Sequence, residues 1–398
     1  MTDLLPQPLS HLVPPAVMEP RHLLGAVEDD WQAIEVWLAM LAARPVSAAT
    51  MATYRREQRR LRWYCDHVQA PPLRQWTYQD VAAYVSFLRT KAPANRCPQG
   101  LKPTDPGWTP FRNGQMSDAS IASTIRILNT LFGFWQEAGY RNANPFAAAT
   151  RTVPRSAGGP ASRRAVPPDA LEIVRRSMAA REKHTARDHL TYWRNAFLLL
   201  LLERTGLRAN EVAQANMIDV HTVSDPATAR HYWALAVNHQ KGGGTGIVPL
   251  DNDVMHAFFR YRGAFQLPEM PRHDEDFGLV LSPHTAAGQD ESVYTSPRAR
   301  RGRTMWKSVR TRQSVWAIVR QEFDAAAQWI GPKSPEAATL RRASTHWLRH
   351  TRGTVLSLQG KELRLVAKAM RHKDPRTTML YTDLEFLDVV RALEAPPK

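Results

Sequence analysis

Residues 346–350 of the chain read His-Trp-Leu-Arg-His. Because His346 and Arg349 are three positions apart, they share one face of a helix. Leu348 belongs to the same helix and points inward. His350 lies four positions after His346, a spacing that also suits a metal site. No glutamate stands between the two histidines and no third ligand is apparent, as a zinc-protease site would require. The stretch therefore predicts a helix that presents an imidazole and a guanidinium together, without a metal.

The composition favours two packed domains and a polyanionic partner. The 398 residues suffice for two domains, and a hydrophobic share of 43% indicates a globular chain rather than a disordered one. The 53 Lys and Arg residues against 37 Asp and Glu give a net charge of +16. This surplus favours nucleic acid over an acidic membrane surface, the other partner that charge alone allows.

Two cysteines, Cys65 and Cys97, exclude a disulfide framework, and nothing near them has the spacing of zinc ligands. The first residues have no basic region and are interrupted by prolines, so they predict no signal peptide. The longest apolar run, 196–202, is far below the ~20 residues needed to cross a bilayer. We therefore expect a soluble, cytoplasmic protein without a membrane partner.

A second basic residue at a helix end is Arg208. It follows an apolar helix and Gly206, a residue type that suits the left-handed conformation at which helices end. Glu211, three residues on, is placed to hold the guanidinium. Taken alone, such a turn more often carries an ordinary surface arginine.

Lys241 stands at the entry to a glycine-rich turn. The Tyr/Trp/Val-rich stretch 231–240 and the stretch 247–250 flank this turn, which predicts a β-hairpin. A lysine on such a turn is mobile and exposed by default. The functional interpretation is that the turn delivers its ammonium group into a DNA groove.

Two more polar residues follow in the last part of the chain. Apolar residues at helical spacing over 363–370 predict a helix that ends just before His372, since 373–375 read Lys-Asp-Pro. A new short helix from about Arg376 carries Tyr381, nine positions after His372. A tyrosine on a helix is usually half-buried core, so Tyr381 alone indicates little.

Together these residues form a set that can bind a phosphodiester and break it without a metal. Its members are Arg208, Lys241, His346, Arg349, His372 and Tyr381, with Glu211 in support. A tyrosine hydroxyl has a pKa near ~10 and needs help to act as a nucleophile. The arginines and histidines can neutralise the phosphate oxygens and stabilise the charge of a pentavalent transition state.

The order and spacing of this set resemble the tyrosine recombinases, the family of the phage integrases. In that family the second-arginine motif commonly reads His-X-Leu-Arg-His, as at 346–350, and the lysine turn is followed by Val-Pro-Leu, as at 248–250. The chain departs from the pattern at 243–245, which lack the basic residues often found there. It also has Arg371 where the family's Leu-Gly-His motif has glycine. Either a tighter turn or a phosphate contact would explain Arg371, and both remain open.

The resemblance implies a mainly α fold with a small β-hairpin or sheet. It would comprise an N-terminal helical core-binding (SAM-like) bundle and a C-terminal mixed α+β catalytic domain. The implied activity is site-specific recombination of double-stranded DNA, in which Tyr381 forms a 3′-phosphotyrosyl bond and Lys241 acts as general acid. His346 would donate to the phosphate, and His372 would donate likewise or accept a proton. The family works as a tetramer on DNA without cofactor, metal or ATP, in some cases with accessory proteins that bend DNA or set direction.

The chain itself divides by pattern into four parts. Residues 1–27 are Pro-rich and aperiodic, as in a flexible tail. Apolar residues at helical spacing predict four helices, an all-α DNA-binding bundle, in 28–150. Residues 151–168 are rich in Gly, Pro and Ser, which is typical of a linker. Residues 169–398 are mostly helical with the one hairpin, and form the expected catalytic domain.

Five arginines cluster on one predicted helix of the first domain: Arg55, Arg56, Arg59, Arg60 and Arg62. We expect them to contact DNA phosphates, although a solvated helix face is the plainer alternative. The polar insertions at 91–116 and 265–303 have the composition either of partner-binding segments or of ordinary loops.

Two other functions fit parts of the pattern. A type IB topoisomerase uses a similar set of residues to relax supercoils, and a DNA-binding regulator could keep the fold without the chemistry. The helical first domain, the 346–350 motif and the spacing from His372 to Tyr381 favour a recombinase over both. The sequence determines neither the DNA site, nor integration against excision or resolution, nor whether the tail after Tyr381 docks in cis or in trans.

Overall fold

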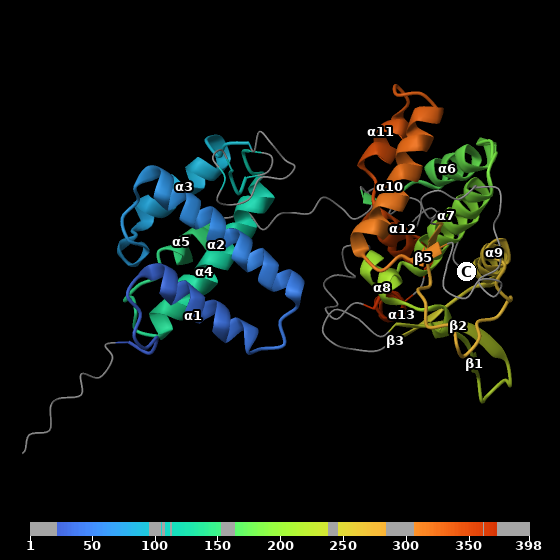
Figure 1. Cartoon of the computed structure of the whole chain (residues 1–398), viewed down its shortest axis with the longest axis horizontal. Coiled ribbons are helices and arrows are strands. Elements are labelled where there is room, and N and C mark those ends of the chain that lie inside the picture. Colours follow the sequence, from blue (N-terminus) through green and yellow to red (C-terminus); the bar gives the residue numbers. More distant parts are fainter. Residues whose placement is uncertain are drawn as a thin grey trace, which may run out of the picture. The chain divides into compact units, whose positions relative to one another are not determined.

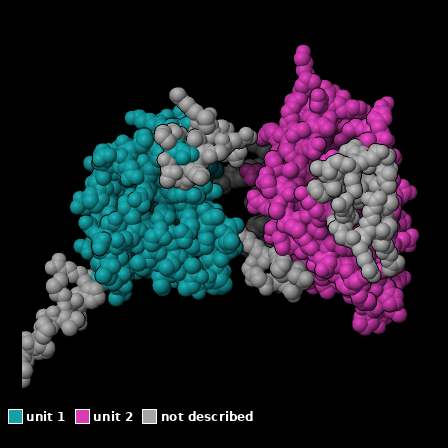
Figure 2. All heavy atoms as spheres, in the orientation of Figure 1, with its two compact units in different colours: residues 1–157 teal, residues 158–398 magenta. Residues whose placement is uncertain are grey.

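The computed structural model describes residues 22–94, 105, 108–111, 114–152, 164–237, 246–283, 306–360 and 362–371. The chain divides into two compact units, residues 1–157 and 158–398 (Figure 2). Each unit has a hydrophobic core of its own. Within the described residues, no helix combines the length and the apolar character needed to span a bilayer.

The first unit is all-α in its described part. Its helices are α1 (Asp30–Ala42), α2 (Ala48–Val68), α3 (Tyr78–Thr90), α4 (Asp118–Glu137) and α5 (Phe146–Thr152) (Figure 1). Side chains at the helix starts explain where they begin: the Ser47 hydroxyl accepts a hydrogen bond from the Thr50 amide at 3.2 Å, and Asp80 accepts one from the Thr77 amide at 2.7 Å. The predicted bundle of helices is confirmed, but α5 was not predicted.

Aromatic side chains fill the centre of this unit. Trp76, Tyr84, Phe132 and Trp135 are almost completely buried. The Trp135 indole N–H donates to the Ala33 carbonyl oxygen, which gives the buried polar group its partner. A core of large rings at helical spacing accounts for the folding of a unit with little β-structure.

The second unit is α+β, with most of its helices around α7. The helices are α6 (Pro168–Ala180), α7 (Ala186–Thr205), α8 (Ala209–Gln214), α9 (Asn252–Ala264), α10 (Arg312–Trp329), α11 (Pro335–Arg342), α12 (Thr345–Leu358) and α13 (Leu363–Ala369). Helix α7 carries the run of leucines at 198–202 and packs against α9, α12, α6 and α10, while α10 and α11 lie side by side (Figure 1). The mainly α fold predicted from the sequence is therefore confirmed.

Two small antiparallel sheets complete this unit. Strands β1 (Val220–Ser224), β2 (His231–Val237) and β3 (Gly246–Pro249) form one, and β4 (Leu281–Pro283) and β5 (Trp306–Ser308) form the other. In the first, Ala234 pairs with Pro249 and Val237 with Gly246, so the predicted hairpin is present. The third strand, β1, was not predicted.

Candidate active site

Three of the predicted site residues line one cavity of about 520 Å³ in the second unit. Arg208 comes from the start of α8, and His346 and Arg349 come from the first turns of α12. The two arginines are 141 positions apart in the sequence, and the packing of α12 against α7 accounts for their approach. The cavity is open to solvent and large enough to admit a phosphodiester group.

Arg208 projects from the tight turn between α7 and α8. Gly206 ends α7 in the left-handed conformation, with φ of 61°, and Leu207 is fully buried beneath the turn. The Arg208 guanidinium donates from Nη1 to Glu211 Oε1 at 2.8 Å, and its backbone amide donates to Glu211 Oε2 at 2.8 Å. The contact expected between Glu211 and Arg208 is therefore present. About a third of the Arg208 side chain stays exposed, on the side of the cavity.

Arg349 is held more tightly, because only 3% of the residue is exposed. Its Nη1 donates to the Gly206 carbonyl oxygen at 2.6 Å, and its Nη2 donates to the Met370 carbonyl oxygen. The guanidinium is thus fixed between the α7–α8 turn and the end of α13. A cation fixed in this way needs little reorganisation when an anion enters the cavity.

His346 is exposed at the edge of the cavity, one helical turn before the buried His350. The two imidazole rings meet edge to face, with centroids 4.5 Å apart. Partial desolvation of the imidazole by surrounding protein atoms lowers the pKa of His346. The positive charges of Arg349, Arg164 and Arg208 lower it further. A phosphate in the cavity would act in the opposite direction.

Other residues of the cavity wall were not predicted. They include Asn210 at the start of α8 and Arg312, Gln313 and Trp316 at the start of α10. Arg312 and Trp316 are one helical turn apart, and about a third of Trp316 is exposed. No local motif marks these residues. Asn210 lies there because it is two residues from Arg208, whereas only the packing of α10 against α8 brings the three α10 residues to the site.

Three of the predicted catalytic residues lie outside the described residues: Lys241, His372 and Tyr381. Lys241 falls between Val237 and Gly246, where the description stops and resumes. His372 and Tyr381 come after Arg371, the last residue described. Their proposed roles remain predictions.

The predicted DNA-contacting arginines lie in the first unit, on α2. Arg55, Arg56, Arg59 and Arg62 are exposed. Arg60 differs, because only 16% of its side chain is exposed and its Nη1 donates to Glu57 Oε1 at 2.9 Å. Glu57 is itself buried, so Arg60 serves the packing of this unit as a counterion.

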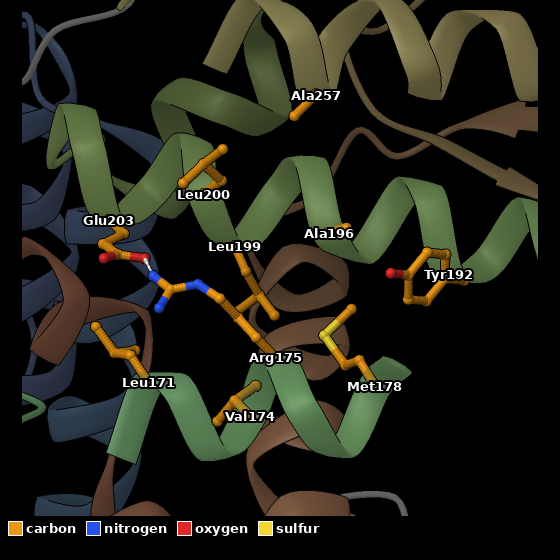
Figure 3. A pocket seen from close by; sticks show the side chains of 10 residues that line it. All are labelled: Leu171, Val174, Arg175, Met178, Tyr192, Ala196, Leu199, Leu200, Glu203 and Ala257. Carbon is orange, nitrogen blue, oxygen red and sulfur yellow. Dashed lines mark hydrogen bonds and ion pairs between the residues drawn. The ribbon is translucent and has the colours of Figure 1, made fainter. Parts of the chain in front are cut away.

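A second cavity, of about 220 Å³, shares no lining residue with the first. Figure 3 shows its mostly apolar walls, which come from α6, α7 and α9. At one end the Arg175 guanidinium donates to Glu203 at 2.5 Å. In the described part of the chain, no cluster of three or more His, Cys, Asp or Glu side chains is arranged to hold a metal ion. The three predicted catalytic residues that the structure describes line the first cavity and not this one.

Comparison with solved structures shows what fold the chain has. The XerH site-specific recombinase bound to palindromic difH substrate, in a post-cleavage complex, superposes with a TM-score of 0.55 at 17% identity, over 91% of this chain and 83% of that one. The Tn1549 transposon integrase in complex with transposon right end DNA gives a TM-score of 0.54 at 14% identity, over 91% and 98%.

Sequence comparison points the same way. Tyrosine recombinase XerC of Roseiflexus sp. (strain RS-1) is 21% identical over 369 residues, which cover 92% of this chain and 93% of that protein. Tyrosine recombinase XerD of Oceanobacillus iheyensis is 26% identical over 189 residues, 48% of this chain and 50% of that protein. The model of the phage integrase family matches residues 174–387, more than half of the chain. The chain belongs to the phage integrase family, the tyrosine recombinases.

Proposed function

We propose that the protein is a site-specific DNA recombinase that cleaves and rejoins DNA through a covalent 3′-phosphotyrosyl intermediate. The observation that carries the proposal is the convergence of Arg208, Arg349 and His346 on one cavity. Family membership and the DNA complexes of the XerH recombinase and the Tn1549 integrase support it. The reaction serves the integration, excision or resolution of a DNA element.

The two arginines bind the scissile phosphate. A guanidinium is planar, keeps its charge at every relevant pH and can donate to two phosphate oxygens at once. Arg349 is already fixed by the carbonyl oxygens of Gly206 and Met370, and Arg208 by Glu211. Both charges are therefore in place before the transition state forms. His346, at the edge of the same cavity, donates a further hydrogen bond to the phosphate.

The bond changes follow from the family pattern. The Tyr381 hydroxyl oxygen attacks phosphorus and loses its proton, and His372 is the acceptor that the family pattern supplies. The bond from phosphorus to the 5′-oxygen breaks, and that oxygen takes a proton from Lys241. A 5′-hydroxyl from a partner strand then attacks the phosphotyrosine and gives up its proton. The bond from phosphorus to the tyrosine oxygen breaks, and that oxygen takes a proton back, which restores the tyrosine. The adduct conserves the energy of the bond, so neither ATP nor a metal ion is consumed.

The partner we propose is double-stranded DNA, contacted outside the catalytic unit by the exposed arginines of α2. Arg55, Arg56, Arg59 and Arg62 belong to this set. Arg56 and Arg60 both contact Glu57, but half of the Arg56 side chain is exposed, whereas the Arg60 side chain is largely buried and is left out. Exchange between two duplexes needs four active sites, so the active form is a tetramer on DNA, assisted where needed by accessory proteins. Such a protein works in the cytoplasm, on the chromosome or the mobile element.

A covalent adduct that survives denaturant tests the proposal directly. Wild type, Tyr381→Phe and Arg349→Ala are incubated, without metal or ATP, with nicked duplexes that tile the DNA flanking the gene. We expect an adduct in wild type, none in Tyr381→Phe and a severe loss in Arg349→Ala. Tight DNA binding by wild type without any adduct would contradict the proposal and favour a DNA-binding regulator.

A further inference from the structure

Arg371 occupies a backbone position that suits glycine. Its φ is 54°, in the left-handed region of backbone conformation, which residues other than glycine adopt at an energetic cost. The residue immediately precedes His372 and stands where the family's Leu-Gly-His motif has glycine. A chain that keeps an arginine in this conformation needs a compensating interaction, and the guanidinium provides one.

The Arg371 side chain is turned into the protein, with 7% of it exposed. Its Nη2 donates to Glu211 Oε2 at 3.1 Å and to the Gly206 carbonyl oxygen at 3.4 Å. Its Nη1 donates to the Ala369 carbonyl oxygen at 3.1 Å. Protein acceptors therefore engage both terminal nitrogens, and Arg371 is not among the residues that line the cavity. Of the two explanations that the sequence left open, a direct phosphate contact is disfavoured.

These acceptors are the same groups that fix the two cavity arginines. Glu211, of which 2% is exposed, accepts from Arg208 as well as from Arg371. The Gly206 carbonyl oxygen accepts from Arg349 as well as from Arg371. Burial alone would raise the pKa of Glu211, but the charge of Arg371 and the hydrogen bonds and charge of Arg208 lower it. Glu211 thus remains ionised between two guanidinium groups.

We propose that Arg371 is a positioning residue, which bridges Glu211 and the Gly206 carbonyl so that Arg208 and Arg349 are held in a fixed mutual arrangement. It also ties the end of α13, from which the chain continues to His372 and Tyr381, to the same turn. By sharing the charge of Glu211, Arg371 leaves Arg208 available to the phosphate. The inference rests on the proposed recombinase function.

The test compares cleavage with binding in matched variants. Arg371→Met removes the charge but keeps an extended side chain, Arg371→Lys keeps the charge, and Arg371→Gly removes the backbone strain together with the contacts. Arg364→Met, at an exposed position on α13, the helix that precedes Arg371, is the control. Each protein is assayed for single-turnover adduct formation on the nicked duplex at saturating DNA, and separately for DNA affinity and melting temperature.

We expect Arg371→Met and Arg371→Gly to slow adduct formation by about 10- to 100-fold, the effect of a displacement on the order of 1 Å. DNA affinity should change by less than about threefold, because many phosphate contacts remain. Arg371→Lys should recover part of the rate, and Arg364→Met should match wild type. In a Glu211→Gln background, Arg371→Met should add little, since the two residues act through one contact.

Several outcomes would overturn the inference. One is wild-type cleavage by Arg371→Gly, which keeps the fold without strain. Another is a double variant, Arg371→Met with Glu211→Gln, whose rate of adduct formation falls by the product of the two single reductions. That result would mean that the two residues act independently. Wild type without an adduct would instead refute the recombinase function, and the positioning role with it. An active wild type with unchanged variants refutes the positioning role alone.

Discussion

The α7–α8 turn requires two things of Gly206: a left-handed backbone conformation and room for the neighbouring side chains. Replacing Gly206 with alanine, next to a control that tests the conformation alone, measures the two separately. The φ of Gly206 is +61°, and an added Cβ would lie 3.2 Å from Cε and Sδ of Met370 and 3.3 Å from Cβ of Arg352. Gly360 is a matched control, because its φ is +67° and an added Cβ would meet nothing within 4 Å. Both substitutions strain the backbone, but only the first crowds the site.

The structure sets the size of the difference. The left-handed conformation costs an alanine about 1–2 kcal/mol, and this applies to both variants. Overpacking typically adds about 1–3 kcal/mol, which applies only to Gly206→Ala because Met370 and Arg352 must move. We therefore expect losses of about 1–2 kcal/mol for Gly360→Ala and about 2–5 kcal/mol for Gly206→Ala. The extra loss corresponds to a melting temperature about 2–12 °C lower in a unit of this size.

Activity should separate the variants further. The Gly206 carbonyl oxygen accepts from Arg349 at 2.6 Å, so a shift of this turn moves a guanidinium that lines the cavity. Urea unfolding and single-turnover adduct formation would be measured at a temperature at which both variants are folded. We expect Gly206→Ala to cleave at least about tenfold more slowly than Gly360→Ala. Equal stability and equal cleavage in the two variants would refute the reasoning.

Three further predictions concern buried charges and pH. Arg262→Met should lower the free energy of unfolding by about 3–5 kcal/mol, because it leaves the Glu275 carboxylate buried without its guanidinium, and a small loss in denaturant titration would contradict this. Glu57→Gln should lower the free energy of unfolding by about 1–3 kcal/mol, because it weakens the hydrogen bond from the buried Thr124 hydroxyl and removes the ion pair with Arg60. Calorimetry would measure this, and wild-type stability would contradict it. The pKa of His346, measured by NMR with His346→Gln for assignment, should lie below the usual ~6.5 and rise when DNA binds. Because the unfolded chain takes this proton first, stability should fall as pH drops below about 6.5, and His346→Gln should reduce that slope.

The sequence could predict those features of the site that depend on near neighbours in the chain. Gly206 ends α7 and Glu211 binds Arg208 because both interactions span only a few residues. The face shared by His346 and Arg349 follows from helical spacing in the same way. The glycine-rich turn between two β-branched and aromatic stretches predicted β2 and β3.

Features that depend on distant packing could not be predicted. Arg312 and Trp316 reach the cavity only because α10 packs on α8, and nothing in their own segment distinguishes them from other helix residues. The link from Arg371 to Glu211 joins residues 160 positions apart. Arg60 was grouped with its neighbours by charge, but it faces the buried Glu57 and not solvent. Periodicity identifies a buried face, but it does not reveal which charged residue has a buried partner on that face.

The guanidinium groups held at the α7–α8 turn are arranged in a way that suits the proposed chemistry. Among the described residues there, three guanidinium groups (Arg208, Arg349 and Arg371) share contacts with the single carboxylate of Glu211 and the carbonyl oxygen of Gly206. A phosphodiester carries one negative charge, whereas the pentavalent transition state of its cleavage carries two. Guanidinium groups that are fixed before the substrate binds therefore stabilise the more highly charged transition state better than the ground state, which is the condition for catalysis rather than for binding alone.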